Sequence, residues 1–405
     1  NYLNKTVRTI FLGTIYPKER LEEIRENSLL GIDNASDNLQ WALIDGLDHF
    51  IENLTIVSLP FIRNYPKGYK KMIFKSSFFS HKSGAKDICV GFVNLVGIYS
   101  LHRYLASYRV LKSLLSKKES TTIIIYAAHA PFLKAVSKLK SKGYLIKTCL
   151  IVPDLPIFLL EQKTNKILKW LKEIDNNIIE KNRQGIDSYM ILSDFMREKF
   201  NLFNKPFTII EGIYNGDTIN ESVTKEKYKT ILYTGKMSKN QGISNLLEAF
   251  KKIKSPDYRL WIRGFGTMKN AVLLATEKDN RIKYIEEMSR EDLLKLQKKA
   301  TVLINPTPSN SIGANFFFPS KTMDYLASGT PTIMCKLECL PKEYHKHIFF
   351  IEDESISGMK EKLIEVCEMP QVELDEFGKK ASSFIFKNKN PIEQVRGLIN
   401  MLNQI

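Results

Sequence analysis

Short apolar runs rich in β-branched residues recur along the whole chain, and helical patterns separate them. In the first half these runs are Val7–Leu12, Leu54–Leu59, Ile88–Val93, Thr122–Tyr126, Lys147–Val152 and Tyr189–Leu192. In the second half they are Thr208–Glu211, Thr230–Tyr233, Arg259–Ile262, Ile282–Ile285, Thr301–Ile304, Pro331–Met334 and Ile348–Ile351. Continuous apolar strands that alternate with helices indicate parallel sheets covered on both faces. The sequence therefore predicts an α/β protein with doubly wound, Rossmann-like sheets.

The length of 405 residues exceeds what one ordinary core can hold and favours two domains. We place the first domain at residues 1–207 and the second at residues 208–387. The last segment, Pro391–Ile405, has an amphipathic helical pattern, and we expect a helix over 388–405 to pack back on the first domain. Sheets of this kind bind ligands at the carboxyl ends of their strands, so two facing sheets would form a central cleft.

Charge and cysteine usage narrow the class of protein. The formal net charge is +16, which indicates an anionic partner such as a nucleic acid, a membrane surface or a phosphorylated substrate. The number of cysteines is odd and none forms a Cys-x-x-Cys pair, so we expect buried free thiols in a reducing cytoplasm and no zinc site. No apolar run reaches the roughly 20 residues of a membrane-spanning helix, and we expect no signal peptide.

The segment Phe318–Met334, FPSKTMDYLASGTPTIM, combines a helix start with charged side chains. Ser320 can cap the helix, and Lys321 and Asp324 lie in its first turn. A helix start gathers unpaired backbone N–H groups, which suits an anion such as a diphosphate. Asp324 could accept hydrogen bonds from sugar hydroxyls. The alternative is a capped surface helix whose Asp complements the helix dipole.

Two further turns with glycine follow strands in the second half. Gly235 and Lys236 come directly after one strand, and Gly264 and Gly266 follow the next. Glycine lets the backbone approach a phosphate, and lysine supplies a point charge. Each turn alone is common in α/β proteins. Together with the strand VLINPTPSNS before the Phe318–Met334 segment, they predict a phosphate site at the strand ends of one sheet.

This order of motifs resembles the nucleotide-sugar domain of glycosyltransferase family 4, which has the GT-B fold, and it is most similar to bacterial members that build polysaccharides. The likeness covers most of the chain and is strongest over Thr208–Met334. It implies that Lys236 and Lys321 stabilise the donor diphosphate and act catalytically, and that Asp324 binds the ribose. The other donor-binding residues that it implies are Gly235, Lys239, Gly264, Gly266, Asn315, Ser320 and Thr322.

Two positions depart from the family pattern. A second basic residue is expected where the chain has Gln241, and Lys239 could take its place. The first of two paired glutamates would fall at Phe316, which cannot act as a carboxylate. The loop Ser311–Asn315 is then the candidate for holding the sugar hydroxyls.

The likeness is looser in the first domain. His129 and Asp154 each follow a strand, where the family places polar residues that face the reacting sugar. The alternatives are a structural histidine and a turn-forming aspartate between prolines. The segment GIDNASDNLQWAL could line the acceptor side through Asn34, Asn38 and Gln40, or it could be a capped loop and helix with Ser36 as the cap.

The resemblance implies a glycosyltransferase that moves a sugar from a nucleotide-diphosphate-sugar to a hydroxyl acceptor with retention of configuration. Lysines and helix starts could stabilise the departing diphosphate without a metal, and no Asp-x-Asp cluster follows a strand. We expect no cofactor and favour a UDP-sugar over a GDP-sugar as donor. The alternatives are a GT-B nucleotide-sugar epimerase and a non-catalytic nucleotide-binding subunit.

The segment Phe61–Lys86 holds seven Lys/Arg, six aromatics and no acidic residue. This composition suits an anionic bilayer, with Phe74, Phe78 and Phe79 at the acyl boundary. It predicts a cytoplasmic enzyme, peripheral on the inner face of the bacterial plasma membrane, that acts on a lipid-linked or surface glycan precursor. A solvated basic loop is the alternative. A nucleic-acid partner is a remote alternative. The sequence contains no nucleic-acid-binding motif, so we expect no such partner.

Overall fold

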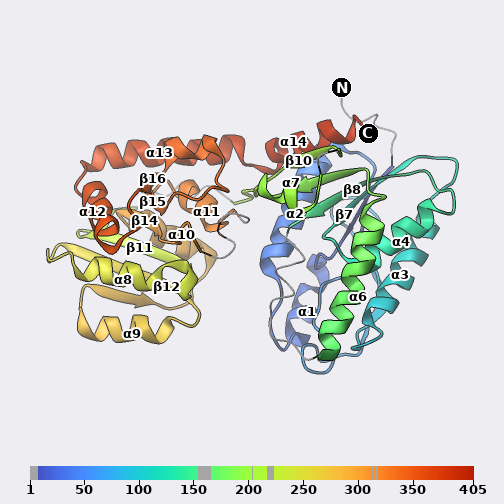
Figure 1. Cartoon of the computed structure of the whole chain (residues 1–405), viewed down its shortest axis with the longest axis horizontal. Helices are drawn as coiled ribbons and strands as arrows, with labels where there is room; N and C mark the ends of the chain where they lie inside the picture. The colour runs from blue at the N-terminus through green and yellow to red at the C-terminus, as the bar shows by residue number, and fades with distance from the viewer. Residues whose placement is uncertain (1–7, 154–165, 203, 217–222, 312–313, 315–317) are drawn as a thin grey trace. The chain divides into compact units, whose positions relative to one another are not determined.

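The structure is a computed structural model that describes residues 8–153, 166–202, 204–216, 223–311, 314 and 318–405. The chain divides into two compact units, shown in Figure 1. The first comprises residues 1–213 together with 391–405, and the second comprises residues 214–390. The sequence analysis ended the first domain at residue 207, whereas the first unit continues to 213 because the strand at 207–209 pairs within its sheet.

The first unit is built on an eight-stranded sheet with the order β10-β9-β8-β7-β1-β2-β5-β4. Its strands run parallel except β4, which pairs with β5 in the antiparallel sense at one edge. The parallel strands confirm the predicted doubly wound architecture. The strands are β1 (Arg8–Gly13), β2 (Leu54–Ser58), β4 (Ser77–Phe79), β5 (Asp87–Cys89), β7 (Thr121–Tyr126), β8 (Ile146–Val152), β9 (Ser188–Ile191) and β10 (Phe207–Ile209).

Two strand predictions were wrong in detail. The run Ile88–Val93 is not one strand, because β5 ends at Cys89 and β6 (Phe92–Val93) pairs instead with β3 (Ile73–Phe74) in a separate two-stranded sheet. The run Thr208–Glu211 was counted with the second half. It lies at the edge of the first sheet, where Phe207 pairs with Tyr189.

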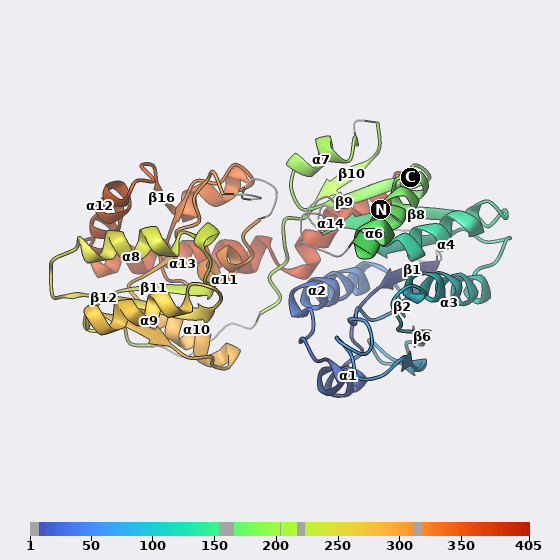
Figure 2. The same ribbon diagram turned by 60° about the horizontal axis from the view of Figure 1, so that its bottom comes forward.

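The helices of the first unit pack in two groups. Helices α3, α4 and α6 lie side by side, and α14 packs on α2 although the two are far apart in sequence (Figures 1 and 2). A Cβ at Gly46 would lie 2.3 Å from the carbonyl oxygen of Pro391, so glycine permits this close approach. The helices are α1 (Leu21–Asn27), α2 (Asn34–Phe50), α3 (Tyr99–Leu114), α4 (Ala130–Lys140), α6 (Lys166–Arg183), α7 (Phe195–Lys199) and α14 (Pro391–Leu402).

The second unit has a six-stranded, fully parallel sheet with the order β13-β12-β11-β14-β15-β16. Its strands are β11 (Lys229–Lys236), β12 (Tyr258–Phe265), β13 (Ile282–Ile285), β14 (Val302–Asn305), β15 (Thr332–Cys335) and β16 (Phe349–Ile351). Its helices are α8 (Ile243–Lys251), α9 (Lys269–Lys278), α10 (Arg290–Lys299), α11 (Lys321–Ala327), α12 (Ile356–Cys367) and α13 (Gln371–Asn388).

The chain enters and leaves the second unit at neighbouring points. The backbone N–H of Tyr214 donates to the carbonyl oxygen of Lys389 over 2.8 Å, and the Tyr214 ring packs edge-on against Phe386 at 5.3 Å between centroids. The first residue of this unit therefore contacts residues close to its last one, so the two ends of the unit lie next to each other.

All five cysteines are buried and free of disulfides, as predicted from their number and spacing. Burial raises the pKa of the thiols, for example to about 12 at Cys149, so they are packing residues at neutral pH. Among the helices in the described part of the chain, none is both long and apolar enough to cross a membrane.

Candidate active site

Lys321, the first residue of α11, is the most unusual charge in the second unit. Its ammonium lies 3.1 Å from the hydroxyl of Tyr233 and 3.2 Å from Oε1 of Gln241, and it sits 4.4 Å from the centroid of the Tyr233 ring. Burial lowers its pKa to about 7. No carboxylate of the described residues forms an ion pair with it, so the group is suited to an anion that comes from outside the protein.

Gln241 is the position at which the family pattern expects a basic side chain. Its Oε1 accepts hydrogen bonds from Lys321 and, over 3.4 Å, from the hydroxyl of Thr307. An amide here can accept from the ammonium, whereas a second cation at the same place would repel it. Gln241 therefore provides a neutral acceptor for the Lys321 ammonium.

Helix α11 is held against β11 by Tyr325, which is completely buried. Its hydroxyl donates to the carbonyl oxygen of Thr234 and accepts from the Thr234 N–H, at 3.1 and 2.8 Å. Gly235 follows, and a Cβ there would lie 3.4 Å from the Lys321 nitrogen. The absence of a side chain keeps the space beside the ammonium open.

Gly264 and Gly266 have a structural role that the sequence analysis did not predict. A Cβ at Gly264 would lie 1.8 Å from the carbonyl oxygen of Gly235, and one at Gly266 would lie 2.3 Å from that of Met237. Strands β11 and β12 stay paired to their last residues, Lys236 and Phe265, so the backbones of the two turns touch. These glycines are required by this contact whether or not a phosphate binds nearby.

The other predicted donor residues fall into three groups. The side chains of Lys236, Lys239 and Ser320 are exposed, and that of Asp324 is about half exposed with the Arg290 guanidinium 3.9 Å away. Thr322 is completely buried against Met334, so it packs in the core and does not face a ligand. Ser320 makes no side-chain cap to α11, contrary to expectation. Asn315 and Phe316 lie outside the described residues.

In the first unit, His129 precedes α4 and accepts a hydrogen bond from a buried arginine that the sequence analysis missed. Nε of Arg103, which is 0% exposed, donates to Nε2 of His129 over 3.0 Å. The other guanidinium nitrogens donate to the carbonyl oxygens of Leu59 and Pro60 at 2.5 and 3.0 Å. Burial and the Arg103 charge hold the pKa of His129 well below its usual value. The imidazole is therefore neutral, with its proton on Nδ1.

The turn that presents His129 is strained. Ala127 has φ of 67°, a left-handed conformation that costs a residue with a Cβ about 1–2 kcal/mol. Its N–H donates to the carbonyl oxygen of Ile151 over 3.0 Å, which ties the turn to β8. Strain of this kind concentrates at functional sites, so it is consistent with a functional role for this end of β7. Asp154, the other predicted catalytic residue here, lies outside the described residues.

The predicted acceptor residues separate into exposed and buried ones. Asn34 and Asn38 are exposed on α2. Gln40 is completely buried, and its Oε1 accepts from the Thr14 N–H over 2.8 Å, so it supports the loop after β1 and is not open to a ligand. Ser36 does not cap α2, because the side chain of Asp33 accepts from the Ser36 N–H and provides the cap.

Asp37 also supports the loop after β1. Its Oδ1 accepts from the Tyr16 N–H over 2.8 Å, and burial raises its pKa to about 6. The sequence analysis did not select it, because one aspartate in the first turn of a helix carries no distinctive signal.

The basic segment Phe61–Lys86 is folded onto the first unit and includes β3 and β4. Of the aromatics predicted at a lipid boundary, Phe78 is 82% exposed, but Phe74 and Phe79 are buried core residues. The reason is the strand alternation, which turns Phe74 and Phe79 inward. The lysines of the segment remain on the surface or partly exposed.

His81 anchors this segment between two carboxylates. Its Nδ1 lies 2.6 Å from Oδ2 of Asp87 and its Nε2 lies 3.1 Å from Oδ1 of Asp48, with the ring fully buried. The two carboxylates outweigh the effect of burial and raise the pKa of His81 to about 9. At neutral pH the His81 side chain is therefore charged, and it holds the segment in place through these two ion pairs. Within the described ranges, no three His, Cys, Asp or Glu side chains gather in a group able to hold a metal ion.

Residues 216–401 match the family model described as glycosyl transferases group 1. The matched region contains Gly235, Lys236, Gln241 and Lys321. No curated protein matches the chain in sequence.

Three solved structures illustrate the likeness in fold. Sucrose-phosphate synthase from Thermosynechococcus elongatus is 11% identical with a TM-score of 0.61, and 98% of each chain is covered. HepE from Anabaena in complex with UDP is 11% identical with a TM-score of 0.60, covering 98% of this chain and 100% of that one. The catalytic domain of starch synthase IV from Arabidopsis thaliana, bound to ADP and acarbose, is 8% identical with a TM-score of 0.62, covering 98% and 100%. The chain has the GT-B fold.

Proposed function

We propose that the chain is a glycosyltransferase that moves a sugar from a nucleotide-diphosphate-sugar to a hydroxyl acceptor. The observation that carries the proposal is Lys321 at the strand ends of the second unit, a partly buried ammonium whose partners among the described residues are neutral and include no carboxylate. The match of residues 216–401 to glycosyl transferases group 1 supports it. The transferred group would leave its diphosphate beside Lys321.

The chemical demand is the negative charge that develops on the departing diphosphate. An ammonium in a site of low dielectric stabilises such charge more strongly than one in water. Lys236, exposed after β11, would supply a second cation, and Gly235 would leave room between the two. We propose that these groups suffice without a divalent metal and that the reaction retains the anomeric configuration, with the leaving phosphate accepting the acceptor's proton.

The half-exposed carboxylate of Asp324 is proposed to accept hydrogen bonds from the ribose hydroxyls. We favour a UDP-sugar over a GDP-sugar, a choice supported by the UDP in the HepE structure. On the acceptor side, Asn34 and Asn38 remain candidates because they are exposed. His129 would donate its Nδ1 proton to a sugar hydroxyl and would not act as a base at Nε2, which already accepts from Arg103. Asp154 and Asn315 stay in the proposal on the sequence resemblance alone.

A transfer assay with UDP-, GDP- and ADP-sugars tests this function, with Lys321→Met as the variant and Lys278→Met, an exposed lysine on α9, as the control. We expect at least a hundredfold loss of kcat/KM in the first variant, none in the second, and unchanged turnover in excess EDTA. Sugar isomerisation without an acceptor would indicate an epimerase. Nucleotide binding without turnover of any donor would indicate a non-catalytic subunit.

We also propose that the first unit docks on an anionic bilayer at the cytoplasmic face. Lys67, Lys70 and Lys75 are exposed and belong to the same segment as Phe78, which is 82% exposed. Each basic residue near such a surface is worth about 1 kcal/mol. Cosedimentation should rise with the anionic lipid content of vesicles and fall with salt. A Lys67→Glu, Lys70→Glu, Lys75→Glu variant that sediments like the parent would overturn this docking.

A further inference from the structure

The hydroxyl of Tyr233 links the start of α11 to the turn at the end of β11. Tyr233 stands on β11 and is completely buried. Its hydroxyl donates to the carbonyl oxygen of Lys236 over 2.6 Å, and the Lys321 ammonium donates to the same hydroxyl over 3.1 Å. A phenol carries one proton, so the bond to the carbonyl oxygen leaves the lone pairs of the hydroxyl for Lys321.

Gln241 is the second acceptor for the same ammonium. It lies in the short helical turn Lys239–Gln241 before α8, and its Oε1 is 3.2 Å from Nζ of Lys321. The Thr307 hydroxyl lies 3.4 Å from that oxygen, on the segment that follows β14. The two acceptors thus hold the ammonium from different elements of the second unit.

This arrangement leaves one N–H group of Lys321 for a ligand. An ammonium has three N–H groups, and the described residues provide acceptors for two of them. A Cβ at Gly235 would lie 3.4 Å from Nζ of Lys321, and because glycine has none, there is room beside the ammonium. The third N–H group is therefore available to an anion.

The two acceptors also favour the charged form of Lys321. Burial lowers its pKa to about 7, and no carboxylate of the described residues forms an ion pair with it. Tyr233 on β11 and Tyr325 on α11 remain neutral at pH 7, because burial raises their pKa. Hydrogen bonds to neutral acceptors stabilise the ammonium relative to the amine, and losing one of them should lower the pKa by about one unit.

We propose that Tyr233 and Gln241 are positioning residues of the donor site that act through Lys321. They hold its ammonium in one place, so that the remaining N–H group meets the donor diphosphate when the nucleotide binds. The inference rests on the proposed transferase function and adds to it the residues that set the geometry and charge of Lys321. It also gives Gln241 a role at a position where the family pattern expects a basic side chain.

The test is calorimetry of UDP binding to the full chain at pH 7, in pairs of buffers with different ionisation enthalpies. Tyr233→Phe removes the hydroxyl and keeps the ring, whose centroid lies 4.4 Å from the Lys321 nitrogen. We expect the affinity to fall about fivefold and proton uptake to rise from about 0.5 to about 0.9 per site, because the pKa of Lys321 falls from about 7 to about 6. Gln241→Met, at a partly exposed position, should shift both quantities in the same direction.

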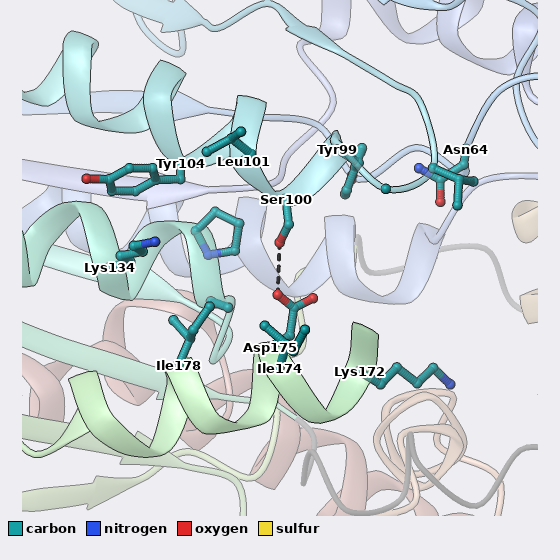
Figure 3. Close-up of a pocket in the computed structure, with 14 residues that line it drawn as sticks. Asn64, Tyr99, Ser100, Leu101, Tyr104, Lys134, Lys172, Ile174, Asp175 and Ile178 are labelled. Atoms are coloured by element: carbon teal, nitrogen blue, oxygen red, sulfur yellow. Dashed lines mark hydrogen bonds between the residues drawn. The ribbon is translucent and has the colours of Figure 1, made fainter. Parts of the chain in front are cut away.

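Two control variants lie in the first unit. Tyr189→Phe removes a hydroxyl of the same kind, since Tyr189 is buried and donates to the carbonyl oxygen of Arg183 over 2.8 Å. Ser100→Ala removes a hydrogen bond to a carboxyl group. In a pocket of about 400 Å³ between α3, α4 and α6, the Ser100 hydroxyl donates to Oδ1 of Asp175 over 2.9 Å (Figure 3). Both variants should change UDP affinity less than twofold and keep the parental proton uptake.

A double variant shows whether the effect passes through Lys321. In a Lys321→Met background, Tyr233→Phe should change UDP affinity less than twofold. The same fivefold loss in both backgrounds would overturn the proposal, as would parental proton uptake in both Tyr233→Phe and Gln241→Met. A purely structural hydroxyl would lower the temperature of thermal unfolding and leave the uptake at about 0.5.

The outcome is independent of the test of the transferase function. Failure of the parent protein to transfer sugar from any donor would refute the proposed function, and shifted proton uptake would still identify the positioning residues of a nucleotide site. Parental uptake in the two variants, together with sugar transfer that depends on Lys321, would refute the positioning role alone.

Discussion

Nucleotide binding should depend on pH through Lys321. With a pKa of about 7 in the free protein, the side chain is mostly neutral at pH 8 and above. A bound diphosphate favours the ammonium, so binding must take up a proton over this range. If the affinity follows the charged fraction, it falls about fiftyfold between pH 7 and pH 9, or about 2.3 kcal/mol. The terminal phosphate of UDP loses its second proton near pH 6, below this window.

The stability of the unliganded protein should change in the opposite direction. The pKa of Lys321 is lower in the folded chain than the ordinary value of 10.5, so the unfolded chain binds more protons between about pH 7 and pH 10.5. The contribution of this residue to the free energy of unfolding therefore increases as the pH rises through that window. Lys321→Met should abolish both effects, with weak and pH-independent UDP binding.

The assay is isothermal titration calorimetry of UDP at pH 7, 8 and 9, in pairs of buffers with different ionisation enthalpies. At pH 8 we expect uptake of about 0.9 proton per site, the neutral fraction of a group with a pKa of about 7. The Lys278→Met control should keep this uptake. Affinity that is flat between pH 7 and 9, or proton uptake that persists in Lys321→Met, would refute the assignment of Lys321 to the diphosphate.

Three further outcomes are expected. His81 contributes about 3 kcal/mol to the free energy of unfolding. This contribution is complete below pH 6.5 and disappears as the pH rises through about 9. Urea unfolding at pH 7 and 10 should therefore show a loss of stability at pH 10 that His81→Gln lacks. Gly264→Ala should cost about 3 kcal/mol or more, because its Cβ would overlap a carbonyl oxygen, and thermal unfolding should show this loss with or without UDP. Arg103→Met should raise the pKa of His129 toward 6.5 in NMR titration, and an unchanged pKa would contradict the contact.

The sheets could be predicted because apolar runs in parallel strands leave a direct trace in the sequence. Ile282–Ile285 was predicted with the bounds it has, and the other strands of the second unit differ by few residues. The short strands β3 and β4 were missed because they alternate inward and outward within a basic segment. There, composition suggested a surface loop and concealed Phe74 and Phe79 in the core.

The candidate site was only partly predictable. Lys321 and Gly235 could be selected because they stand in a motif at strand ends. Arg103 could not, since its partners are backbone carbonyl oxygens and a histidine that are distant in sequence. Thr322 was selected because the family resemblance implied it, and Gln40 because its amide offers hydrogen bonds, but each faces the interior of its own unit. Burial of a polar residue depends on tertiary packing, which single-residue chemistry does not reveal.

The hydrogen bond between Tyr214 and Lys389 makes the second unit a cassette inserted into the first. Both of its ends meet at one point, so residues 214–390 could be exchanged for the equivalent segment of another protein without moving the ends of the host. The residues proposed to bind the donor lie within that cassette, whereas Asn34, Asn38 and His129, proposed for the acceptor side, lie in the first unit. If the proposed transferase function holds, a chimera should change the donor sugar while the acceptor is kept.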